Sequence, residues 1–174
     1  MSVLPRQGLA QSDSKLRFTQ HEVLYHYNMK VFPCFWAKLI DLAQQGVVYT
    51  LDKVQQEIMA VGDDAVAKWF KSNFPQGGIL PVDGPTYTAY QTVLNKVNSR
   101  DWFSTAAITE FSNQDKADAF LCSYAMSHLD FAVVSYEKGN PERKNKVMLP
   151  DICNSVGVSC QQVIQMFLDL EVVF

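Results

Sequence analysis

The stretch Asp115–Asp151, DKADAFLCSYAMSHLDFAVVSYEKGNPERKNKVMLPD, decides the fold that the sequence predicts. The stretch predicts an amphipathic helix with Asp118 near its start, followed by a buried strand over Phe131–Ser135. Glu137 comes just after the end of that strand, and a basic loop follows. Acids therefore stand at a helix N-terminus and at a strand C-terminus. In an open α/β sheet such ends meet at the edge where ligands bind. The two acids predict a divalent-metal site, provided that other elements supply one or two more.

The composition indicates one globular, intracellular domain. The chain has 174 residues, of which 48% are apolar and 19% charged, and its net charge is −3. This mild acidity argues against a protein that coats nucleic acid, but it leaves room for a local basic patch. Four scattered cysteines without a CxxC motif predict buried thiols in a reducing cytoplasm. No run approaches the roughly 18 apolar residues of a membrane span, and no cleavable leader is evident.

Upstream of the deciding stretch, helical and extended patterns alternate. The run CFWAKLIDLAQQ (34–45) has helical spacing and is closed by Gly46, and VVYT (47–50) follows as a short buried strand. In the next helix, LDKVQQEIMAVG (51–62), Asp52 begins a pattern that resembles a capping box. Glu57 has no such explanation, and it faces either the strand edge or solvent. Further helices are predicted over 63–74, 87–97 and 106–111, with a loop over 75–85.

Downstream, a short strand is predicted over 146–149, a helical turn up to Val156, a strand over 158–163 and a closing helix over 164–170. Alternation of this kind predicts a parallel sheet covered by helices on both faces.

The N-terminal 20 residues give no clear first strand. Val3–Leu4 and Leu16–Phe18 are the short candidates. The His21-Glu22 pair does not begin an HExxH zinc motif, because Tyr25 occupies the second histidine position and His26 comes one residue late.

Five runs resemble an uncharacterised family of PIN-like domains related to VapC-type toxin ribonucleases, over roughly residues 25–174. They are FPCFWAKL (32–39), VVYTLDKVQQEI (47–58), KADAFLCSYA (116–125), VVSYEK (133–138) and KVMLPDICNSVGVSC (146–160). The resemblance implies a three-layer α/β/α fold with a central parallel sheet. It also implies RNA cleavage with Mg²⁺ or Mn²⁺ held by carboxylates, and a toxin restrained by an antitoxin protein.

The resemblance assigns catalytic and metal-binding roles to Glu57, Asp118 and Glu137. It adds Asp151 as a metal ligand, although a helix N-cap explains that residue equally well. PIN domains also carry an Asp at the end of the first strand, for which Asp13 in Asp13-Ser14-Lys15 is the nearest match. On this basis, residues 1–20 form a divergent N-terminal segment and residues 21–174 a single PIN-like domain.

The chemistry of phosphodiester hydrolysis suits these residue types. A hard cation on carboxylates activates water and neutralises charge that develops at phosphorus, and Mg²⁺ needs only one or two direct carboxylates. Four cations close to Glu137 form either a phosphate grip for RNA or a solvated loop, because Glu142 offsets part of their charge. They are Lys138, Arg143, Lys144 and Lys146.

Two functions stay open at this point: a metal-dependent endoribonuclease, and a catalytically degenerate PIN-like module that binds RNA or a partner protein. If the acids cluster without a cation, the pKa of at least one should be raised. The weak first strand further predicts that the N-terminal segment is displaced or supplied by a second copy, and that exposed sheet edges favour a homodimer.

Overall fold

A parallel sheet lies at the centre of the fold in the computed structural model, which describes residues 15–18, 27–60, 62, 65–99 and 101–173. Within these residues the strand order is β3-β2-β1-β4-β5, and every neighbouring pair is parallel. The strands are β1 (Lys15–Phe18), β2 (Val48–Leu51), β3 (Ile79–Leu80), β4 (Phe131–Ser135) and β5 (Cys160–Gln162). The α/β class that the sequence predicts is therefore confirmed.

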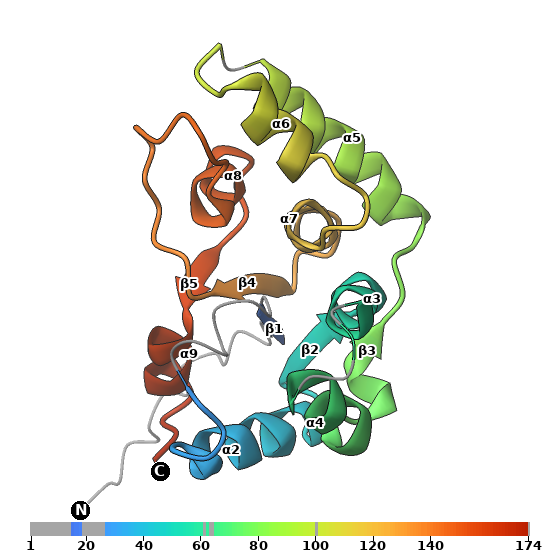
Figure 1. The fold of residues 1–174 in the computed structure, drawn as a ribbon, viewed down its shortest axis with the longest axis vertical. Helices are drawn as coiled ribbons and strands as arrows, with labels where there is room; N and C mark the ends of the chain where they lie inside the picture. The colour runs from blue at the N-terminus through green and yellow to red at the C-terminus, as the bar shows by residue number, and fades with distance from the viewer. Residues whose placement is uncertain (1–14, 19–26, 61, 63–64, 100, 174) are drawn as a thin grey trace, which may run out of the picture.

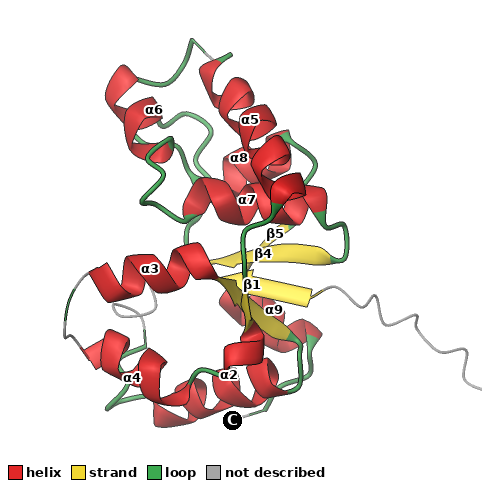
Figure 2. Ribbon diagram, turned by 90° about the vertical axis from the view of Figure 1, so that its right-hand side faces the viewer, coloured by secondary structure: helices red, strands yellow, loops and turns green. Residues whose placement is uncertain are grey.

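Helices lie on both sides of the sheet. Figures 1 and 2 show α5, α6, α7 and α8 on one side and α2, α4 and α9 on the other, with α3 near the ends of the strand arrows. The helices are α2 (Pro33–Gln44), α3 (Asp52–Ala60), α4 (Ala65–Asn73), α5 (Gly84–Asn98), α6 (Thr105–Phe111), α7 (Asp118–Ser127), α8 (Leu149–Ser155) and α9 (Val163–Asp169), with a 3-10 turn η1 (Gln76–Gly78).

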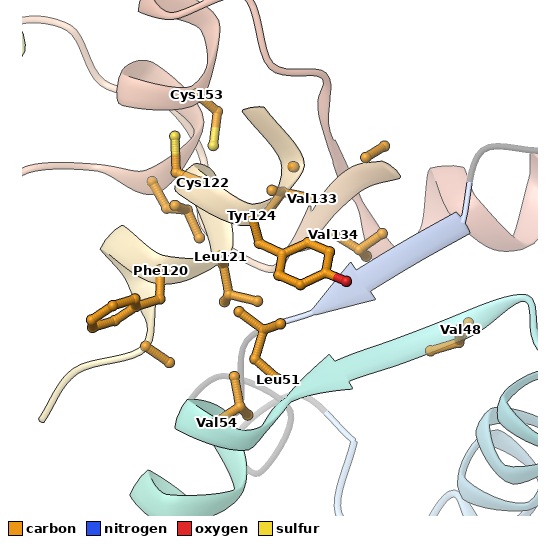
Figure 3. Packing of buried hydrophobic residues seen from close by; sticks show 14 of the residues in the cluster. Val48, Leu51, Val54, Phe120, Leu121, Cys122, Tyr124, Val133, Val134 and Cys153 are labelled. Atoms are coloured by element: carbon orange, nitrogen blue, oxygen red, sulfur yellow. The ribbon is translucent and has the colours of Figure 1, made fainter. Parts of the chain in front are cut away.

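Helix α7 is the most enclosed helix on its side of the sheet. All seven residues from Ala119 to Ala125 are buried, so the expectation of an amphipathic helix is wrong: this helix is covered on every side. The Phe120 ring stacks on Tyr90 of α5 at 4.4 Å between centroids. Figure 3 shows Leu121 above the strands and Cys122 facing Cys153 of α8. Each fully buried Phe or Leu side chain stabilises the fold by about 1.5–3 kcal/mol.

Strand β1 occupies the middle of the sheet. It pairs with β4 from Lys15↔Phe131 to Phe18↔Val134 and with β2 at Leu16↔Val48. The expectation that the N-terminal segment is displaced, or supplied by a second copy, is therefore wrong, and the sheet extends into the segment set apart as residues 1–20. The homodimer was expected from sheet edges left exposed by a missing first strand, and β1 fills that place. The homodimer itself stays a prediction.

The secondary structure of two segments differs from the prediction. No strand forms over 146–149, because Val147 and Met148 lead directly into α8, whose first residue is Leu149. The 75–85 segment, expected to be a loop, contains η1 and β3, and Ile79 pairs with Thr50 of β2.

The four thiols are free but not uniformly buried. Cys122 and Cys153 are buried, Cys160 is partly exposed and Cys34 is exposed, so the expectation of buried thiols is right for two of them. None of the described helices has the length and apolar character needed to cross a membrane.

Candidate active site

Three carboxylates approach one another where the parallel strands end. Glu57 comes from α3, which follows β2 directly, Asp118 is the first residue of α7, and Glu137 lies two residues beyond β4. Figure 2 shows the arrows of the sheet pointing toward the side where α3 lies. Both glutamates act electrostatically on Asp118, so the three form one charged cluster, here called the acid cluster.

Asp118 has the most perturbed acid–base chemistry in the cluster. Burial in the protein, followed by the charges of Glu137 and Glu57, raises the pKa of Asp118 to about 7, against the lowering influence of Lys146 and Lys116. The expectation of a raised pKa is confirmed. The side chain keeps some solvent contact, and among the described residues its carboxylate has no hydrogen-bond or ion-pair partner. Asp118 is therefore poised to exchange a proton, or to accept a cation, near neutral pH.

Glu137 is held in place by three polar contacts. Its backbone N–H donates to Ser135 Oγ at 3.0 Å, which fixes the turn beyond β4. One carboxylate oxygen accepts from Leu149 N at 2.9 Å, at the N-terminus of α8, and the other is bound by the Lys146 ammonium. The Glu137 side chain is only 7% exposed. The charge of this buried carboxylate is thus balanced by a lysine and a helix end.

Glu57 has the same kind of contacts as Glu137. One oxygen accepts from Ala117 N at 3.3 Å, at the N-terminus of α7, and the other lies 3.4 Å from Lys116 Nζ. Each glutamate therefore receives one backbone N–H from a helix start and one lysine. Contacts of this kind can serve only to fix the starts of α7 and α8, or they can position carboxylates for a metal. The catalytic and metal-binding roles of Glu57 and Glu137 therefore stay predictions.

The carboxylates do not form a ready metal site. Among the residues that the structure describes, no group of three or more His, Cys, Asp or Glu side chains is placed to hold a metal ion. The donor chemistry suits Mg²⁺ or Mn²⁺, but Lys116 and Lys146 already engage Glu57 and Glu137. A divalent cation would have to displace an ammonium group to reach either glutamate.

The position that follows β1 does not carry the acid that the resemblance leads us to expect. Because β1 ends at Phe18, the next residue in the sequence is Thr19, which has no carboxylate. Asp13 precedes β1 in the sequence and lies outside the described residues, as do His21 and His26.

Asp151 makes a contact that the sequence did not predict, and its role as a metal ligand stays a prediction. The N-cap of α8 is Met148, so the N-cap interpretation of Asp151 is wrong. Its carboxylate instead accepts from Asn140 N at 2.7 Å and lies beside Gly139. Asp151 therefore anchors the loop between β4 and α8, and no contact in the described part of the chain joins it to the acid cluster.

One cation of the basic loop is partly buried in an ion pair and three are exposed, although the Arg143 guanidinium also donates to Asn145 Oδ1 at 3.1 Å. Lys146 pairs with Glu137, whereas Lys138, Arg143 and Lys144 are exposed. Trp102 was not among the predicted site residues, yet its ring lies under the Lys144 ammonium at 4.7 Å. A lone tryptophan far from the basic loop in sequence gives no signal that the two meet in the fold.

Comparison with known proteins identifies a family whose function is unknown. Residues 19–174 match a family described as a domain of unknown function (DUF4411), and the chain belongs to that family. No curated protein and no solved structure matches the chain.

Proposed function

We propose that this chain is a PIN-like domain with a three-layer α/β/α architecture, and that it acts as a metal-dependent endoribonuclease. One observation supports this above the others: Glu57 and Glu137, which come from separate elements, both act electrostatically on Asp118 at the start of α7. In open α/β sheets, ligands bind at the edge where the strands end. Carboxylates that repel one another without a cation are typical of sites for hard divalent metals.

The cation in this proposal is Mg²⁺ or Mn²⁺, with Asp118 as the first ligand because its carboxylate has no partner among the described residues. When bound, the metal supplies charge neutralisation and a more acidic water. Glu57 and Glu137 would hold the cation together with Asp118 only if Lys116 and Lys146 moved away from them. The exposed cations Lys138, Arg143 and Lys144 contact RNA phosphates.

A second candidate is a catalytically degenerate PIN-like module that binds RNA or a partner protein. Two observations favour it. Thr19 stands where the first-strand acid is expected, and the lysine pairs satisfy Glu57 and Glu137 without any metal.

The decisive experiment combines Mn²⁺ titration calorimetry with cleavage of a labelled single-stranded RNA. We expect Asp118→Asn to abolish both Mn²⁺ binding and cleavage, and Asp115→Asn, an exposed acid on the same approach to α7, to leave both unchanged. RNA binding without Mn²⁺ binding by the wild-type chain would exclude the nuclease and favour the degenerate module.

The toxin role, an antitoxin partner, a cytoplasmic location and a homodimer belong to the same proposal. Induced expression in a bacterial host tests the toxin role. We expect the wild-type chain to arrest growth and Asp118→Asn to be tolerated at an equal protein level. Equal growth of the two strains would contradict it.

A further inference from the structure

Trp102 is unusual among the tryptophans of this chain because it lies on the surface. Its side chain is 41% exposed, whereas Trp36 is 4% exposed and packs edge-on against Trp69 at 4.5 Å. Trp102 belongs to the connection between α5 and α6. Exposed single apolar residues need no explanation by themselves, so its neighbours decide what this indole can bind.

The indole is tied to the basic loop that follows β4. The Lys144 ammonium lies 4.7 Å from the ring centroid, and Ser104 N donates to the backbone carbonyl of Lys144 at 2.8 Å. Figure 1 shows the loop before α8 (orange) on the same side of the sheet as the α5–α6 connection. Both Trp102 and Lys144 are exposed. The indole is therefore partly open to solvent, and the side chain that covers one of its faces is itself exposed.

The same loop leads from the indole to the acid cluster. Lys144 and Lys146 are two residues apart, so their backbones are at most about 7 Å from each other, and Lys146 binds Glu137. Lys138 and Arg143 add two exposed cations, against two exposed carboxylates, Glu142 in the same loop and Asp101 beside Trp102. A cationic strip with one exposed aromatic ring thus ends at the acid cluster of a chain whose net charge is −3.

We propose that Trp102 stacks on a base of single-stranded RNA while Lys144 contacts the adjacent phosphate, so that the strand is guided toward the acid cluster. This inference rests on the proposed function in taking RNA as the ligand of that cluster. Single-strand sites combine cations that follow the backbone with aromatic rings on which bases stack. When a base stacks on the Trp102 ring, it replaces the Lys144 ammonium, which then contacts the phosphate.

The test measures binding of a fluorescently labelled, mixed-sequence single-stranded oligoribonucleotide by anisotropy, without divalent metal so that the RNA stays intact. We expect Trp102→Ala to weaken binding about tenfold, within the range that stacking of one base on an aromatic ring contributes. Trp102→Phe should recover most of the affinity, because a phenyl ring still stacks. Tyr87→Ala, which removes an exposed aromatic ring from α5, is the matched control and should bind like the wild type.

A second pair of variants tests the phosphate contact. Lys144→Gln should lower the slope of log affinity against log salt by about 0.7, the value for one phosphate contact on a single strand. Lys71→Gln removes an exposed cation from α4, on the other side of the sheet, and should leave the slope unchanged.

The outcomes separate this inference from the nuclease proposal. Wild-type affinity in Trp102→Ala, or no RNA binding by the wild-type chain, overturns the role of Trp102. Metal-dependent cleavage that is indifferent to Trp102 overturns this inference alone. Trp102-dependent binding without metal-dependent cleavage supports the inference and overturns only the nuclease.

Discussion

At the scale of single residues, the acid cluster contains carboxylates in two kinds of environment. Glu57 and Glu137 each have a lysine and a backbone N–H, whereas Asp118 has no partner in the described part of the chain. Burial, and then the charges of Glu137 and Glu57, raise the pKa of Asp118 to about 7. The two predictions at this scale follow from that difference.

We expect Asp118→Asn to be more stable than the wild-type protein at pH 8 in the absence of metal. A carboxyl whose pKa is raised in the folded state contributes stability below its unfolded pKa, about 3.9, and that contribution is lost as pH rises through about 7. Because the Asp118 side chain keeps some solvent contact, we expect the free energy of unfolding to increase by only about 1–2 kcal/mol in this variant. Urea unfolding between pH 4 and pH 8 should show the advantage of Asn growing with pH. A pH-independent difference, or an equal effect of Asp115→Asn, would contradict the prediction.

We expect Lys146→Met to destabilise the metal-free protein by about 1–3 kcal/mol, because Glu137 keeps its buried charge and loses its ammonium partner. The same change vacates the place beside Glu137, so added Mn²⁺ should raise the melting temperature more in this variant than in the wild type. Lys138→Met, at an exposed cation of the same loop, is the control. An equal Mn²⁺ shift in all three proteins would mean that Lys146 is purely structural.

At the scale of elements, helix ends are fixed by side chains from distant segments. Asp151 of α8 holds the loop after β4 through Asn140 N. At the far end of α7, His128 Nε2 lies 3.2 Å from Asp83, the N-cap of α5. These contacts decide how the helices meet, and each can be tested separately.

We expect Gly139→Ala to destabilise the fold by about 1 kcal/mol. A Cβ at this position would lie 2.5 Å from Asp151 Oδ1, and the Asp151 side chain can move aside only by giving up its hydrogen bond to Asn140 N. In an Asp151→Ala background the same substitution should cost little, so a double-mutant cycle measured by urea unfolding should show strong coupling. Additive costs would show that Asp151 does not limit the space at Gly139.

We expect Asp83→Ala to cost about 1 kcal/mol at pH 7 and less in acid, while Asp83→Asn retains most of the N-cap. The Asp83 pKa is lowered, chiefly by the Thr86 side-chain hydrogen bond and also by His128. A lowered pKa contributes stability above the unfolded value, and the contribution is lost as pH falls through the folded value. Thermal melts from pH 7 down to pH 3 check this. A cost that persists unchanged in acid would assign the effect to something other than the charged cap.

At the scale of the whole molecule, the sequence predicts elements better than contacts. The apolar run Phe131–Val134 was recognisable as part of a buried strand, and Ser135 with Glu137 marked the turn beyond it. Leu16–Phe18 was one of two short candidates for the first strand, and β1 forms there. Its central place was not predicted, because Lys-Leu-Arg-Phe alternates charged and apolar residues, a pattern typical of a half-exposed strand. Contacts such as Lys116 with Glu57, 59 residues apart, depend on how α3 and α7 pack, which no local pattern encodes.

The central place of β1 predicts different effects for two truncations. A chain that begins at Lys15 retains all five described strands, and we expect it to fold. A chain that begins at Thr19 lacks β1, so β2 and β4 each lose the neighbour that lies between them in the sheet. We expect this chain to aggregate through the two exposed strand edges. Size-exclusion chromatography and circular dichroism distinguish the two. A monomeric, cooperatively folded chain from Thr19 onward would show that β1 is dispensable.

The pairing of β1 with β4 also sets an order of events at the ribosome. Lys15 leaves the exit tunnel early, yet its partner is Phe131, so the first strand to be made waits for most of the chain. At about 5–20 residues per second the wait is roughly 6–23 s. During that interval the N-terminal strand is a nascent segment without its native neighbour β4, within reach of a holding chaperone. The step that completes the sheet therefore comes late in synthesis, and long-range parallel pairing is itself slow.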